Sequence, residues 1–242
     1  MTFQKPKFIE GNFYHIYNRG VEKRNVFLDA ADRFRFVRCL VEFNDERTIA
    51  DAICHRNVGE DRRLEYSLHR RKSENPLVKI LAFCLMPNHF HLLLEQIKEN
   101  GIVAFMQKLG TGYTMYFNKR HERVGHLFQG RFKATHAQDY AHLSHLPFYI
   151  HCNPLGSKFP EWRNCSDNDA FHLEKALAFL ESYRWSSYLD YVGHDNFPEV
   201  LDKEFLTELI GGPERFKEEV IRWLKEKKGG LDSLEELAYK RR

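Results

Sequence analysis

Two histidines separated by one residue are the first feature of this sequence that could do chemistry. His89 and His91 occur in the run Pro87-Asn88-His89-Phe90-His91. On a β-strand, alternate side chains point to the same face, so both imidazoles can reach one metal ion while Phe90 points into the core. An isolated His-x-His is more often a pair of surface histidines. The spacing by itself therefore leaves a metal site and a surface pair both open.

A tyrosine and an asparagine four residues apart form a second candidate site. Tyr149 and Asn153 share one face of a helix, and His145 falls on that face one turn earlier, whereas His151 does not. A tyrosine here could attack a phosphodiester, and the amide oxygen of Asn153 could complete a metal site. The alternative for Tyr149 is a half-buried core aromatic with its hydroxyl at the rim.

A basic stretch from Lys119 to Lys133 is the third feature. It holds five Lys or Arg against one acid, interleaved with aromatics. Cations bind phosphates and aromatic faces stack on unpaired bases, so the stretch predicts contacts to single-stranded nucleic acid. The alternative is a solvated loop followed by a strand that buries Phe128 and Phe132. The candidate DNA-binding residues are Arg19, Lys119, Arg120, Arg123, Gln129, Arg131 and Lys133.

The composition is that of a globular protein without a strong overall charge. The chain has 242 residues, 43% of them hydrophobic, and a formal net charge of +3, so DNA binding has to depend on local clusters of charge. Its five cysteines include no C-x-x-C pair, which argues against a zinc ribbon or a disulfide framework. No signal core and no apolar run of roughly 20 residues is present. We expect a cytoplasmic, nucleoid-associated protein with no membrane contact.

The hydrophobic pattern predicts the elements that must position these side chains. Strands are expected at 13–18, 78–86 and 89–95, with one or two more within 125–136. Helices are expected at 29–46, 102–121 and from Asp139 to about Cys152, where Asn153-Pro154 should end the last one. This order predicts an α+β fold, a ferredoxin-like antiparallel sheet with helices on one face, plus a helical C-terminal tail.

The domain organisation follows from a change of character near residue 160. We expect one domain over 1–160, with 47–76 as an insertion, and a helical C-terminal extension over 161–242.

Five segments in a fixed order resemble the HUH single-tyrosine transposases, in the branch of the REP-associated tyrosine transposases. Each segment is short, but together they extend over about residues 10–195. They are Tyr14-His15-Ile16-Tyr17-Asn18-Arg19-Gly20, Phe83-Cys84-Leu85-Met86-Pro87-Asn88-His89-Phe90-His91-Leu92-Leu93, Gly125-His126-Leu127-Phe128-Gln129-Gly130-Arg131-Phe132-Lys133, Tyr149-Ile150-His151-Cys152-Asn153-Pro154 and Tyr183-Arg184-Trp185-Ser186-Ser187-Tyr188.

The resemblance implies a function and a role for each site residue. Residues 1–160 would form an HUH transposase (nuclease) domain on a ferredoxin-like (RRM-like) sheet. His89 and His91 would bind Mg²⁺ or Mn²⁺, with Asn153 as a third ligand, and Tyr149 would be the catalytic tyrosine. The protein would be a metal-dependent endonuclease and strand transferase that forms a 5′-phosphotyrosine on single-stranded DNA carrying a hairpin or palindromic repeat.

Two other functions remain as alternatives. A non-catalytic, domesticated DNA- or RNA-binding module on the same fold would bind its target without cutting it. A metal-dependent hydrolase of small molecules would need an acidic partner near the histidines, and Glu95 is roughly 13 Å along the strand from His91. The sequence is compatible with a homodimer and with a monomer.

Overall fold

A four-stranded antiparallel sheet forms the centre of the computed structural model, which describes residues 6–46, 73–159 and 170–226. The strand order is β2-β3-β1-β4. The strands are β1 Phe13–Arg19, β2 Val78–Met86, β3 His89–Gln96 and β4 Lys133–His136. With one helix after β1 and one after β3, this is the ferredoxin-like order, so the predicted α+β fold class is confirmed.

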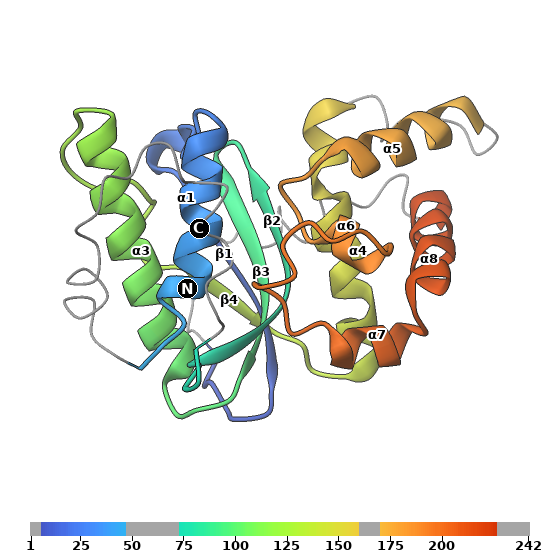
Figure 1. The fold of residues 1–242 in the computed structure, drawn as a ribbon, viewed down its shortest axis with the longest axis horizontal. Helices are drawn as coiled ribbons and strands as arrows, with labels where there is room; N and C mark the ends of the chain where they lie inside the picture. Colours follow the sequence, from blue (N-terminus) through green and yellow to red (C-terminus); the bar gives the residue numbers. More distant parts are fainter. Residues whose placement is uncertain (1–5, 47–72, 160–169, 227–242) are drawn as a thin grey trace.

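One face of the sheet is covered by two helices, α1 Ala30–Glu42 and α3 Gly101–Arg120 (Figure 1). Alternate residues of β3, Phe90, Leu92 and Leu94, pack into a core beneath these helices. The side chain of Asp29 caps α1 by accepting a hydrogen bond from the Asp32 N–H. The predicted pair of helices on this face is therefore present.

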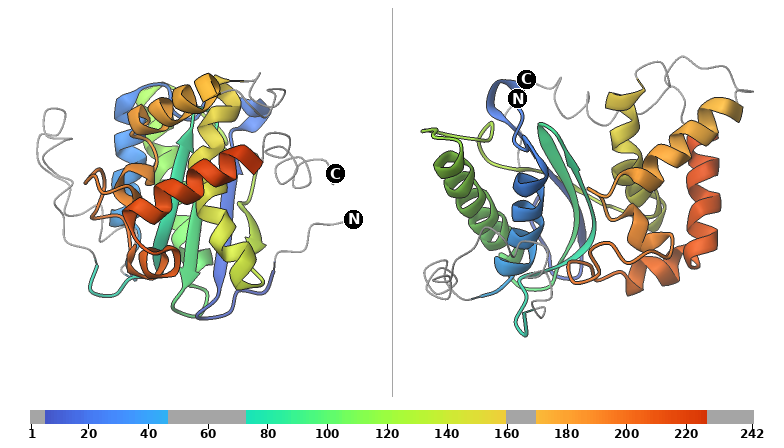
Figure 2. Two further views of the ribbon diagram at one scale, coloured as in Figure 1. Left: turned by 90° about the vertical axis from the view of Figure 1, so that its right-hand side faces the viewer. Right: turned by 45° about the horizontal axis from the view of Figure 1, so that its top comes forward.

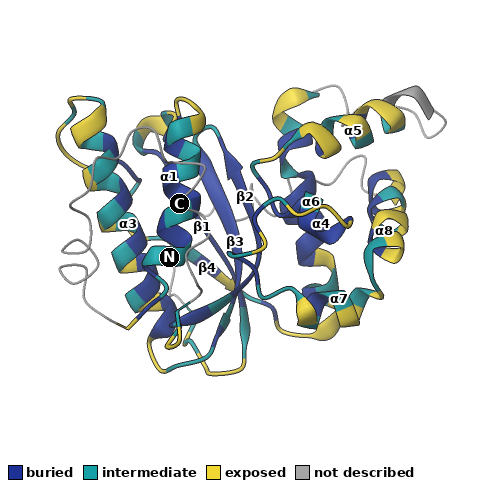
Figure 3. Ribbon diagram, in the orientation of Figure 1, coloured by how far each residue is buried: buried dark blue, intermediate teal, exposed yellow. Residues whose placement is uncertain are grey.

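The opposite face of the sheet is covered as well, by α4 Tyr140–Lys158 and by the C-terminal helices, which gives three layers (Figure 2). A second core joins sheet residues such as Cys84 and Leu93 to Ile150 of α4 and Phe216 of α8. Because both faces are covered, β2 and β3 are buried for most of their length (Figure 3). The remaining helices here are α5 Ala170–Ser182, α6 Tyr188–Tyr191, α7 Glu204–Ile210 and α8 Pro213–Glu226.

The outer edge of β2 is covered by the segment that precedes α6. The Leu85 N–H donates to the Trp185 carbonyl, and the Ser187 N–H donates to the Phe83 carbonyl, at 2.8 and 3.0 Å. The Ser187 hydroxyl in turn accepts from the Phe83 N–H at 2.9 Å. An edge strand that is paired in this way cannot recruit a strand from another chain.

One expectation about the elements is corrected by the structure and another is confirmed. Helix α4 continues past Pro154 to Lys158, because the turn that contains Pro154 also buries Leu155 completely, and that burial offsets a proline cost of about 3 kcal/mol. Within 125–136, where one or two strands were expected, one strand forms, Lys133–His136. Gly125 and Gly130 have positive φ there, which suits a loop.

Some expectations fall on residues outside the described part of the chain. These are most of the expected insertion at 47–76, the expected boundary near residue 160 and the end of the tail beyond 226. Within the described ranges, none of the helices has the length and apolar character that crossing a membrane requires.

Candidate functional site

The register of the sheet places both histidines of the His-x-His pair on the face that α4 covers. In an antiparallel sheet, directly paired residues point to the same side. His91 pairs with Tyr17, and His89 pairs with Arg19. Tyr17 pairs on its other side with Lys133 of β4. The α4 face of the sheet therefore carries imidazole, phenol and cationic groups together, while the β3 residues on the opposite face, Phe90, Leu92 and Leu94, are apolar.

Helix α4 brings Tyr149 onto this face. The Tyr149 ring lies edge-on to the rings of His15 and His91, with centroid distances of 5.6 and 5.8 Å. Tyr149 is only 4% exposed, and its ring borders a cavity of about 30 Å³ that His142 and Thr135 also line. A cavity of this size corresponds to about one water molecule. The tyrosine and the histidines, nearly 60 residues apart in the chain, thus form one site.

The two histidines of the pair are each held by a hydrogen bond to Nδ1. The Nδ1 atom of His91 lies 2.8 Å from Nε2 of His15. The Nδ1 atom of His89 lies 2.6 Å from Oδ1 of Asn88, whose Nδ2 donates to the Lys23 carbonyl. Because an amide oxygen can only accept, the His89 proton is on Nδ1. The lone pair is then on Nε2, as a metal ligand requires.

The two imidazoles of this site could hold a divalent cation, and imidazole by itself favours a transition metal. The rings of His89 and His91 are 5.0 Å apart. Half-buried Asn153 lies one turn beyond Tyr149. Helix α4 runs parallel to β2, and β3 runs antiparallel to β2 (Figure 1). Asn153 is therefore displaced from Tyr149 in the same direction along the sheet as His89 is displaced from His91. Among the described residues, no three His, Cys, Asp or Glu side chains cluster as a metal site. Two imidazoles and one amide leave room for the water and phosphate oxygens that Mg²⁺ or Mn²⁺ keeps.

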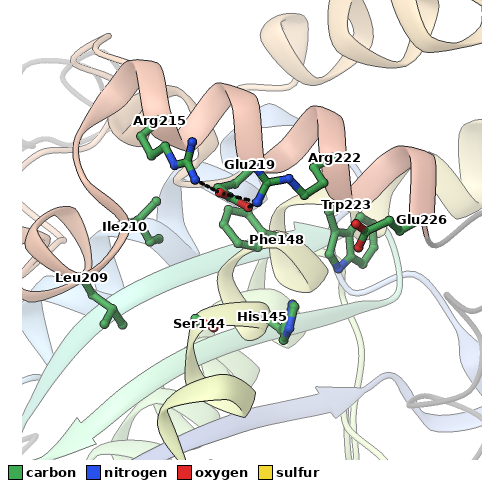
Figure 4. A pocket seen from close by; sticks show the side chains of 10 residues that line it. All are labelled: Ser144, His145, Phe148, Leu209, Ile210, Arg215, Glu219, Arg222, Trp223 and Glu226. Carbon is green, nitrogen blue, oxygen red and sulfur yellow. Dashed lines mark hydrogen bonds and ion pairs between the residues drawn. The ribbon is translucent and has the colours of Figure 1, made fainter.

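Two of the three histidines of α4, His145 and His151, lie away from this site, whereas His142 lines its cavity. His145, predicted to share the face of Tyr149, lines a pocket of about 460 Å³ between α4 and α8, beside Trp223 (Figure 4). His151, predicted to point elsewhere, is fully buried and shares a 2.7 Å hydrogen bond with the Ser187 hydroxyl. Burial lowers the pKa of His151 to about 3, so this imidazole is neutral.

The predicted DNA-binding residues are divided between the two sides of the sheet. Arg19 and Lys133 point to the α4 face with the histidines. The Gln129 N–H donates to the Arg19 carbonyl, which keeps this part of the loop close to that end of β1. Exposed Arg131 follows in the same loop. Arg19 and Lys133 therefore share a sheet face with the histidines, and Gln129 and Arg131 belong to the loop beside the end of β1.

The remaining predicted DNA-binding cations lie at the end of α3 or just after it, on the opposite side of the sheet from α4. Arg120 forms ion pairs with Asp29 and Asp32 at 2.7 and 2.5 Å. The hydrogen bond from Arg120 is the main reason that the pKa of Asp29 is lowered to about 2. Arg123 lies over the Phe117 ring and donates to Asn118, while Lys119 is exposed. The basic stretch is therefore not one continuous surface.

Sequence reasoning did not assign a role to three residues that the structure brings to the site. Asn88 holds His89, and His15 holds His91. Tyr17 stacks on His15, with ring centroids 5.1 Å apart. A signal was available, because alternation along β1 puts His15, Tyr17 and Arg19 on one face. The sequence alone did not give the register between β1 and β3, and this register places that face of β1 beside the histidines of β3.

Comparison with known proteins gives one family match and one similar solved structure. The family model described as "Transposase IS200 like" matches residues 56–153, a span that includes His89, His91, Tyr149 and Asn153. The predicted resemblance to this kind of transposase is thereby confirmed. A comparison with curated protein sequences gives no match.

The similar solved structure is described as "Structure of the REP associates tyrosine transposase bound to a REP hairpin". The two sequences are 12% identical and the TM-score is 0.48. The match covers 84% of this chain and 93% of that chain.

Proposed function

Because residues 56–153 match the IS200-like transposase family, we propose that this chain is a metal-dependent single-stranded DNA endonuclease and strand transferase. One observation carries the proposal. Tyr149 is seated against His91 on the sheet face that also bears His89. The tyrosine and the two histidines that this kind of phosphoryl transfer needs therefore meet at one place.

In this proposal, His89 and His91 hold Mg²⁺ or Mn²⁺ through their Nε2 atoms, and Asn153 is a third ligand from α4. The ion supplies positive charge that neutralises the scissile phosphate and orients it. The hydrogen bonds from Asn88 and His15 keep the two imidazoles in place before DNA arrives. A preformed ligand pair on a rigid strand needs little rearrangement upon binding.

Tyr149 is the nucleophile. Its phenolic oxygen forms a bond to phosphorus while the bond between phosphorus and the 3′ oxygen breaks. The phenol loses its proton, and the leaving 3′ oxygen gains one. The 5′-phosphotyrosine retains the energy of the phosphodiester, so an incoming 3′-hydroxyl can reverse the step without ATP. Packing of the Tyr149 ring against two buried histidines limits the directions from which the phosphate can approach.

The substrate proposed is single-stranded DNA with a hairpin or palindromic repeat, as the resemblance to the REP-associated branch implies. Arg19 and Lys133 flank the site on the same sheet face, and exposed Arg131 extends this cationic surface along the loop. These side chains are placed to contact phosphates on either side of the scissile one.

The first experiment incubates the purified protein and Mn²⁺ with labelled hairpin-containing single-stranded DNA from beside its own gene. We expect a cut strand and a 5′ fragment covalently linked to protein on a denaturing gel. Tyr149→Phe removes the nucleophilic oxygen, so cleavage should disappear while the gel shift of bound DNA stays near normal. Tyr140→Phe is the matched control, because Tyr140 is exposed at the start of the same helix.

Two results would contradict this assignment. Cleavage that persists in Tyr149→Phe would exclude Tyr149 as the nucleophile. DNA that is shifted but never cut, across several metals and with flanks from both sides of the gene, would favour a domesticated binding module on the same fold.

A further inference from the structure

His15 lies at the centre of the candidate site, although it is neither a proposed ligand nor the nucleophile. It is 6% exposed, in the middle of β1. Its ring stacks on His91, with centroids 5.1 Å apart and planes 16° from parallel. Its Nε2 lies 2.8 Å from His91 Nδ1, and Tyr149 lies edge-on to it. One buried side chain thus contacts both a proposed metal ligand and the proposed nucleophile.

The hydrogen bond between His15 and His91 decides which nitrogen of His91 can bind a metal. A neutral imidazole carries one proton, so the two facing nitrogens share one hydrogen bond with a defined direction. If His91 donates from Nδ1, its lone pair is on Nε2. This is the tautomer that Asn88 imposes on His89. The two ligands would then present the same atom to one ion, each oriented by its own neighbour.

The same ring also limits where Tyr149 can move. The rings of His15 and His91 are nearly parallel, and the Tyr149 ring is inclined by 82° and 84° to them. The tyrosine edge therefore rests against two adjacent imidazoles, not one. Removing the His15 ring would enlarge the neighbouring 30 Å³ cavity and leave Tyr149 free to shift.

From these contacts we propose that His15 is a positioning residue: it fixes His91 as the Nδ1–H tautomer for metal binding and it supports the ring of Tyr149. This inference rests on the proposed function, because His91 and Tyr149 take their roles from it.

Two variants of the full-length chain distinguish the effect of the hydrogen bond between His15 and His91 from the effect of the His15 ring. His15→Phe keeps an aromatic ring in the stack but cannot accept a hydrogen bond. His15→Gln loses the ring but can still accept one through its amide oxygen. The tautomer of His91 is read in metal-free protein by long-range ¹H–¹⁵N NMR, and Mn²⁺ affinity is measured by calorimetry. His194→Ala, which removes an exposed imidazole that does not line this cavity, is the control.

We expect wild-type protein and His15→Gln to hold His91 as the Nδ1–H tautomer, whereas His15→Phe shows both tautomers. Loss of an orienting partner typically weakens metal binding 10- to 100-fold, so we expect about that loss in His15→Phe and a smaller one in His15→Gln. His194→Ala should bind Mn²⁺ like wild type.

The outcomes keep this inference distinct from the proposed function. An unchanged His91 tautomer and unchanged Mn²⁺ affinity in folded His15→Phe would overturn the role of His15 alone. Absence of Mn²⁺ binding by the wild-type protein would overturn the metal-dependent function, and with it the ligand role of His91.

Discussion

At the level of single residues, the candidate site is a set of oriented imidazoles. His89 and His91 are buried, and a buried ring with an unconstrained tautomer would present the wrong nitrogen to a cation part of the time. Each Nδ1 has a hydrogen-bonding neighbour: Oδ1 of Asn88 accepts from His89, and Nε2 of His15 lies 2.8 Å from Nδ1 of His91. The orientation of Asn88 is itself set by the Lys23 carbonyl. Under the proposed function, these neighbours orient both metal ligands.

Asn88 gives a prediction at this scale. Asn88→Ala removes the acceptor for His89 Nδ1, so His89 should turn or change tautomer, and Mn²⁺ affinity should fall about tenfold. A calorimetric titration measures the change. Lys23→Ala is the control, because the contact to Asn88 uses the backbone carbonyl of Lys23. Equal affinity in Asn88→Ala and Lys23→Ala would count against a positioning role for Asn88.

At the level of elements, two sets of polar contacts join neighbouring elements of the fold. On the α4 side, the buried hydrogen bond from His151 to Ser187 joins α4 to the segment that pairs with β2. On the other side, Arg120 at the end of α3 forms ion pairs with Asp29 and fully buried Asp32 at the start of α1. A carboxylate without solvent is stable only while it is paired. Arg120 therefore has a structural role that its place in a basic stretch did not reveal.

Arg120→Ala should lower the free energy of unfolding at pH 7 by roughly 1–3 kcal/mol, because charged groups lose their hydrogen bonds. The pKa of Asp29 is about 2 in the folded protein, below its ordinary 3.8. The stability that this pair contributes is therefore complete above about pH 4 and is lost as the pH falls toward 2. Urea unfolding at pH 7 and pH 3 should show a smaller difference between wild type and Arg120→Ala at pH 3.

Lys119→Ala is the control for this prediction, since Lys119 is exposed beside Arg120. If Arg120→Ala and Lys119→Ala unfold at the same urea concentration at pH 7, the ion pairs contribute no stability.

At the level of the whole molecule, charge is distributed by the layers of the fold. The net charge of +3 gives little overall attraction to DNA. The predicted basic stretch is split, with Lys133 on the α4 face and Lys119 on the α3 layer. Under the proposed function, DNA reaches Tyr149 from the side of the sheet that carries Lys133. Cations on that side, or on the loop beside it, are then the ones expected to contact the same strand.

Lys133→Ala should weaken binding of single-stranded hairpin DNA and reduce the salt dependence, because one phosphate contact is lost. The slope of log K against log salt concentration should become shallower by about 0.7. Fluorescence anisotropy between about 50 and 200 mM salt measures this. Lys119→Ala, which removes the same charge from the α3 layer, should leave the slope near that of wild type. A larger effect from Lys119→Ala would place the DNA on the other side of the sheet.

The sequence by itself determined what depends on local periodicity. Alternation along a strand puts His89 and His91 on one face whatever surrounds them, and Asp139 caps α4 as predicted because its side chain reaches the His142 N–H within one turn. The strands of the hairpin and the ferredoxin-like order could also be predicted, since apolar runs and turn residues are local signals.

Only the tertiary structure decided what these side chains meet. His15 and His91 are 76 positions apart, and they touch because β1 pairs with β3 in one particular register. The ion pairs of Arg120 with Asp29 and Asp32 depend on how α3 packs against α1. Pro154 stays inside α4 because the helix buries Leu155 against its neighbours. Register and packing depend on the summed burial of many distant residues, and no local pattern contains that sum.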